Sequence, residues 1–171
     1  QLSYITLGAM LASKSGFIGA SMHIAMHAFA KITLFFAAGA ILVATHKKLI
    51  SEMNGLGRAM PVTFGAFLVG TLSIIGLPPL GGMWSKWYLG LGLVETTQLL
   101  LLAVLMISSL LSIAYLLPIP IRAFFAKPAD GTNYTKIAEA PKPMLLAMII
   151  TSATCVILFF YPDPLYQLAT M

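Results

Sequence analysis

The sequence predicts an all-α fold, a polytopic transmembrane helix bundle, on three observations. Of its 171 residues, 59% are hydrophobic and only 9% are charged, whereas soluble domains carry about 25% charged residues. Three long stretches, residues 59–85, 96–121 and 144–161, contain no charge at all. A membrane-spanning helix needs about 20 mainly apolar residues. We therefore expect residues 1–171 to belong to a single transmembrane domain.

Apolar runs, and the turn and proline residues between them, divide the chain into about half of a helix and four complete spans. The chain opens on Gln1 inside an apolar stretch, which we interpret as the second half of a helix in a longer protein. Lys14-Ser15-Gly16 is expected to be a turn. Pro61 suits the first turn of a helix, while Pro118 and Pro120 should unwind the end of the fourth span. The expected spans are residues 1–13, 17–45, 61–93, 97–121 and 144–161.

A glycine- and proline-rich motif, Gly76-Leu-Pro-Pro-Leu-Gly-Gly82, interrupts the third span. Two prolines and three glycines in seven residues do not sustain a continuous helix. We predict a broken helix over about 62–75 and 83–93. Non-helical backbone at membrane depth occurs inside protein or beside water, and it recurs at transporter ion sites; a static kink is the alternative. The residues of the break are Gly76, Pro78, Pro79, Gly81 and Gly82.

The charged residues outside the spans are distributed asymmetrically and predict an orientation. Basic residues concentrate in the loops after the second and fourth spans, whereas the opposite side has only Lys14. Such loops face the cytoplasm, so Glu95 and the C-terminal tail with Asp163 should face outside. The net charge of +5 is thus a topology signal and indicates no nucleic-acid partner. The basic loop residues are Lys47, Lys48, Arg58, Arg122, Lys127, Lys136 and Lys142.

Two lysines lie within the predicted spans. Lys31 is near the middle of the second span and Lys86 follows the break in the third. A lysine at the bilayer centre costs about 2.5–3.5 kcal/mol on insertion scales, so a functional role is indicated. The alternatives are a snorkelling or hydrogen-bonded lysine and, for Lys86, an interfacial belt formed by Trp84 and Trp87.

His23, His27 and Lys31 follow one another at a spacing of four residues, so they share one helix face about 6 Å apart along the axis. Histidine titrates near neutral pH, and water can bridge such gaps, so the row can exchange protons. His23 could also be a packed polar residue. Zinc binding by the two histidines would need further ligands, which the spans lack. With one cysteine, Cys155, a disulfide framework is excluded, and we expect no metal site and no cofactor.

Several motifs in order resemble the antiporter-like subunits shared by NADH:quinone oxidoreductase, Mrp-type cation/proton antiporters and membrane-bound hydrogenases. The resemblance covers residues 1 to about 125 and is strongest to the Mrp D-like proteins. It rests on four segments: Gln1-Leu-Ser-Tyr4, His23-Ile-Ala-Met-His-Ala-Phe-Ala-Lys31 with the residues up to Ala40, Gly55-Leu-Gly-Arg-Ala-Met-Pro61, and Gly76 to Tyr88.

The resemblance implies a fourteen-helix subunit built of two inverted five-helix repeats, of which this chain is the end of the tenth helix through the fourteenth. It places Lys31 and Lys86 at the family's half-channel positions on helices eleven and twelve, and His23 and His27 in the same chain of groups. The glutamate–lysine pair of the first half-channel lies outside these residues. The implied orientation, with the C-terminus outside, agrees with the one derived from charge.

These observations lead to one functional hypothesis and two alternatives. We expect proton translocation through buried lysines in a subunit of a monovalent cation/proton antiporter. The first alternative is the proton-pumping membrane arm of an NADH:quinone oxidoreductase or hydrogenase, and the second is a non-conducting membrane scaffold. Whether the chain is a subunit of an enzyme is therefore left open. The expected partners are other hydrophobic subunits, lipid, protons and Na⁺ or K⁺. The expected location is a bacterial inner membrane, crossed several times.

Overall fold

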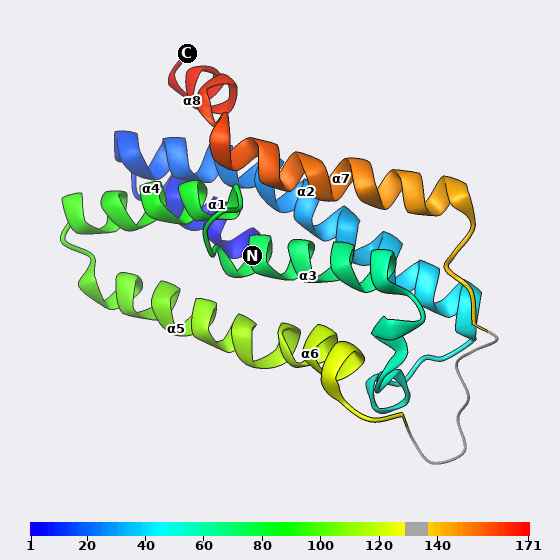
Figure 1. Cartoon of the computed structure of the whole chain (residues 1–171). Coiled ribbons are helices and arrows are strands. Elements are labelled where there is room, and N and C mark those ends of the chain that lie inside the picture. Colours follow the sequence, from blue (N-terminus) through cyan, green and yellow to red (C-terminus); the bar gives the residue numbers. More distant parts are fainter. Residues whose placement is uncertain (129–136) are drawn as a thin grey trace.

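The computed structural model describes residues 1–128 and 137–171, and in these parts every regular element is a helix. The long helices run roughly side by side, whereas α8 projects away from their common direction (Figure 1). Helix α2 packs against α1, α3, α4 and α7. Lys136, one of the basic residues used to predict orientation, lies outside the described residues. The elements are α1 (Leu2–Met10), α2 (Lys14–Thr45), the short 3-10 helices η1 (Ile50–Met53) and η2 (Leu56–Arg58), α3 (Pro61–Ile75), α4 (Gly82–Glu95), α5 (Leu99–Leu116), α6 (Pro118–Phe125), α7 (Lys142–Phe160) and α8 (Asp163–Thr170).

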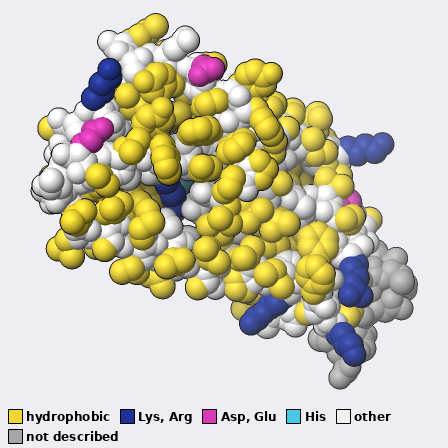
Figure 2. Space-filling model, turned by 60° about the vertical axis from the view of Figure 1, so that its left-hand side comes forward, with side chains coloured by type: hydrophobic (Ala, Val, Ile, Leu, Met, Phe, Trp, Pro, Cys, Tyr) yellow, Lys and Arg dark blue, Asp and Glu magenta, His cyan; other side chains and the backbone are white. Residues whose placement is uncertain are grey.

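The fold class is confirmed: the molecule is a multi-pass integral membrane protein. Within the described residues, three helical stretches, α2, α5–α6 and α7, are long and apolar enough to cross a membrane. Apolar side chains cover most of the face shown in Figure 2, and Lys and Arg side chains gather near one end. At about 1.5 Å per residue, the 32 residues of α2 extend over about 48 Å, which exceeds the thickness of a bilayer core.

Helix α2 begins earlier than predicted. The expected turn at Lys14–Gly16 is wrong, because Ser13 caps the helix and its hydroxyl accepts a hydrogen bond from the Gly16 amide at 3.0 Å. A serine at the N-cap satisfies an amide that the first turn leaves unpaired. The chain reverses just before it, where Ala12 has a positive φ of 49°.

The expected unwinding at Pro118 and Pro120 is also wrong. The chain leaves α5 at Leu117 and continues as α6, with Pro118 in the first turn of the new helix. A proline there removes an amide that would have had no partner in the helix. The helical stretch therefore ends at Phe125 and not near residue 121.

The remaining boundaries lie within a few residues of the predictions. Helix α7 begins at Lys142 and ends at Phe160, against the expected 144–161. Pro162 stops it, but the chain then forms α8, which was not predicted. Leu165, Tyr166 and Ala169 of α8 pack against the start of α2 and against α4, so the apolar face of α8 is partly buried on the bundle.

Candidate functional site

The break between α3 and α4 is confirmed. Residues 76–81 are non-helical, and Gly82 is the first residue of α4. Gly76 ends α3 in the left-handed region, with φ of 87°, which glycine adopts without steric cost. The amide of Gly81 donates to the carbonyl of Cys155 in α7 at 2.9 Å. The C-terminal side of the break, residues 80–82, is thus buried against protein, as non-helical backbone at membrane depth requires, whereas Leu77, Pro78 and Pro79 are exposed.

Lys86 occupies the inner side of this break and is buried, with 8% of its surface exposed. Its Nζ donates to the carbonyl of Ile75 at 2.8 Å and to the hydroxyl of Ser109 at 3.0 Å. It also lies 5.5 Å above the ring centroid of Tyr4. Ile75 ends α3, where the helix dipole is negative and carbonyls lack helical partners. The break therefore provides an uncharged cradle that favours an ammonium group at this position.

His23 is the buried member of the histidine row. Its Nδ1 lies 2.8 Å from the Ser85 hydroxyl and its Nε2 lies 3.1 Å from the side-chain oxygen of Gln1. Ser85 can donate its single proton either to the Gly82 carbonyl, at 3.0 Å, or to His23. In the first case His23 donates to Ser85, and in the second it accepts. The site can therefore accommodate His23 in more than one protonation state.

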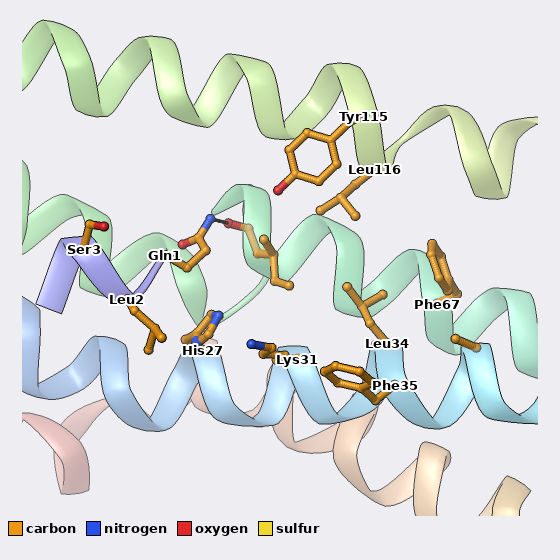
Figure 3. A pocket seen from close by; sticks show the side chains of 12 residues that line it. Gln1, Leu2, Ser3, His27, Lys31, Leu34, Phe35, Phe67, Tyr115 and Leu116 are labelled. Atoms are coloured by element: carbon orange, nitrogen blue, oxygen red, sulfur yellow. Dashed lines mark hydrogen bonds between the residues drawn. The ribbon is translucent and has the colours of Figure 1, made fainter. Parts of the chain in front are cut away.

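His27 and Lys31 continue the row into an open cavity. The rings of His23 and His27 stack with centroids 5.6 Å apart. Lys31, one turn further along α2, is exposed and lines a cavity of about 600 Å³ together with His27, Gln1 and Tyr115. Figure 3 shows Lys31 and His27 rising from α2 into this cavity and the Tyr115 hydroxyl reaching toward them from α5.

The two lysines face different cavities. Lys86 and Ser109 line a second cavity of about 440 Å³, and Lys31 is absent from it. Tyr4 separates the two regions, since its ring packs edge-on against His23 at 5.6 Å and carries Lys86 over its face. A single interior path from Lys31 to Lys86 therefore needs further groups that connect the two cavities.

Sequence reasoning did not single out four residues of this site: Gln1, Tyr4, Ser85 and Ser109. Ser85 could have been suspected because it directly precedes Lys86, and Tyr4 because it belongs to a family-like motif. Ser109 sits in an apolar span with no signal that tells it apart from other membrane serines. In the described residues, no three His, Cys, Asp or Glu side chains come together as a metal site would require.

The fold and the site together define a helical membrane protein with ionisable groups arranged around a broken helix. Comparison with known proteins agrees: residues 1–112 match the transmembrane family of NADH:quinone oxidoreductase and Mrp antiporters. The chain belongs to this family, as its motifs indicated.

Two curated relatives and one solved structure agree with this family. The chain is 39% identical over 144 residues to NADH-quinone oxidoreductase subunit N of Desulforudis audaxviator, covering 84% of this chain and 28% of that protein. It is 30% identical over 156 residues to an Na⁺/H⁺ antiporter subunit of Alkalihalophilus pseudofirmus, covering 85% and 19%. A chain of the Mrp complex of Dietzia sp. superposes with a TM-score of 0.87 at 21% identity, covering 98% and 39%. The chain thus spans less than a third of the length of these two curated relatives.

Proposed function

We propose that this chain forms part of a proton path across the membrane, with Lys31, His27, His23 and Lys86 as its titratable groups. The observation that carries the proposal is the placement of Lys86 beside a broken helix, held by the Ile75 carbonyl and the Ser109 hydroxyl. A lysine in a membrane span is costly, and its hydrogen-bond partners in the described part of the chain are neutral, which leaves it free to exchange a proton.

The histidines support the same function. Their stacked rings lead from the Lys31 cavity to Ser85 next to Lys86. Imidazole both takes up and releases protons near neutral pH. A chain of such groups, bridged by water where gaps remain, is what proton transfer through a membrane needs and what a passive scaffold does not.

Lys31→Met tests this function against the scaffold alternative. The substitution removes an insertion penalty, so the protein should assemble normally, and proton flux into vesicles should fall to background. Lys14→Met is the matched control, because Lys14 lies on the same helix at its exposed end and should keep wild-type flux. Unchanged flux in assembled Lys31→Met protein would favour the scaffold.

The reaction that drives proton transfer differs between two branches of the family, the cation/proton antiporters and the oxidoreductases. The antiporter branch predicts that a pH gradient across vesicles collapses when Na⁺ or K⁺ is added. The oxidoreductase branch, which the 39% identity to a subunit N favours, predicts that the gradient forms on addition of a reductant such as NADH. In both branches the chain works with other hydrophobic subunits in a membrane complex.

The proposed orientation follows from the arrangement of charge. Described basic residues of the loops, among them Lys47, Lys48, Arg58 and Arg122, lie at the end of the bundle that holds η1, η2 and the end of α6. The start of α2 at Lys14, the end of α4 at Glu95 and α8 lie toward the opposite end, where Figure 1 shows these parts of the helices. The positive-inside rule supports a first end that faces the cytoplasm of a bacterial inner membrane and a C-terminus outside.

A further inference from the structure

His23, at the end of the histidine row, hydrogen-bonds Ser85 and Gln1, whereas the Nζ of Lys86 donates to Ile75 and Ser109. Tyr4 stands between His23 and Lys86, with its ring edge-on to the imidazole and its face toward the ammonium group. A ring face attracts a cation but has no atom that can take up and pass on a proton. A continuous proton path therefore needs other groups to reach Lys86.

Hydroxyl groups on α5 lie where such a path would run. Ser109 accepts from Lys86 at 3.0 Å, and the neighbouring Ser108 accepts from the Tyr4 hydroxyl at 2.6 Å. Ser112, one turn along the helix, is buried and donates to the Ser108 carbonyl at 3.0 Å. Tyr115 follows on the same side of α5, since positions three and four apart share a helix face.

The cavities connect through these same residues. Ser108, Ser112 and Tyr115 line a cavity of about 530 Å³ together with Gln1. Gln1 and Tyr115 also line the cavity that holds Lys31. At the other end, Ser109 lines the cavity that holds Lys86. The α5 surface from Tyr115 to Ser109 is thus bordered by hollow space that reaches both lysines.

We propose that protons pass between the Lys31 cavity and Lys86 along α5, with Ser112, Ser108 and Ser109 as relay groups and Tyr4 as the link to α1. This inference rests on the proposed proton-transfer function. In each step a hydroxyl oxygen takes a proton from the Lys86 ammonium group or from a protonated water, while its own O–H bond breaks and that proton passes to the next water, which becomes protonated in turn. Lys86 then returns to the ammonium form by taking a proton from the opposite side.

Water access to α5 tests the path without measuring transport. Ser112→Cys and Ser152→Cys are compared in a Cys155→Ala background, in the membrane complex that carries the chain. Ser152 is the matched control because it also bonds a carbonyl of its own helix, that of Ile149 at 3.1 Å, but lies on α7. A charged methanethiosulfonate reacts with thiolates, which form in water. We expect labelling at position 112 and little at 152; equal, weak labelling at both would overturn the path.

Proton flux provides the second test. Ser109→Ala and Ser112→Ala should each slow flux by about tenfold, as expected when a hydrogen-bonded relay group is lost, while Ser152→Ala keeps the wild-type rate. Lys31→Met is measured alongside. If Lys31→Met abolishes flux but the α5 variants match Ser152→Ala, the α5 path is wrong and the proposed function stands. If Lys31→Met itself keeps full flux, the proposed function fails.

Discussion

Lys31 and Lys86 both interrupt apolar spans, yet the fold gives them different surroundings. Lys86 is held by a carbonyl and a hydroxyl at the helix break, whereas Lys31 is exposed to an open cavity. The sequence predicts that both positions are unusual, because a charge in a span is costly. It cannot predict which neighbours contact the Lys86 ammonium group, since Ile75, Ser109 and Tyr4 come together only through the packing of α1, α3 and α5.

Gly82 is the residue on which the α3–α4 junction depends most directly. A Cβ at this position would overlap the carbonyl of Ser73, and backbone at this contact cannot move aside without opening the break. We expect Gly82→Ala to destabilise the protein by about 1–3 kcal/mol, the usual cost of overpacking, measured as a lower unfolding temperature in detergent.

The control for this substitution is Gly65→Ala. A Cβ at Gly65 meets nothing within 4 Å, and alanine favours a helix over glycine by about 1 kcal/mol. The unfolding temperature of Gly65→Ala should therefore stay the same or rise. Equal destabilisation by both substitutions would show that the junction is not as tightly packed as the structure indicates.

At the level of elements, the start of α3 depends on a residue far away in the chain. Glu139 accepts from the Val62 amide at 2.6 Å and from the Thr63 hydroxyl at 2.7 Å. Its carboxylate thus caps a helix N-terminus, where negative charge is favourable. Sequence reasoning identified Pro61 as a helix start but not this cap, because the partner lies more than seventy residues away and no local motif signals it.

Glu139→Ala should loosen this end of α3. The loss of a capping side chain costs about 0.5–2 kcal/mol, so the Val62 amide should exchange with deuterium faster, and the unfolding temperature should fall slightly. The Met144 amide, which bonds the Pro141 carbonyl at the start of α7, should keep its exchange rate. Protection of Val62 that is unchanged in the variant would contradict the cap.

The elements that were predicted well are those whose signals are local. The break at residues 76–82 follows from proline and glycine content alone, and the ends of α3 and α7 follow from apolar length and flanking prolines. The errors came where one signal allows two outcomes: Pro118 can end a helix or begin one, and Lys14-Ser15-Gly16 can form a turn or the first turn of a helix. Which outcome holds depends on how neighbouring helices pack.

For the whole molecule, the orientation derived from charge predicts that the two ends of the bundle lie on opposite sides of the membrane. Thr170→Cys in α8 should react with a membrane-impermeant thiol reagent in intact cells, and Lys48→Cys should react only in inverted vesicles. The native Cys155 is buried and should contribute little background. Labelling of Lys48→Cys in intact cells would show that the orientation derived from charge is reversed.

The central claim is that Lys31 and Lys86 act in series on one proton path, and proton flux in the double variant tests it most directly. Lys31→Met, Lys86→Met and the combined variant are compared in vesicles with equal amounts of assembled protein. Residues that act as one unit are not additive, so we predict that each single variant reduces flux to background and that the double variant is no slower. Partial flux in both single variants, lost only when they are combined, would mean that the lysines serve separate paths and would contradict the account.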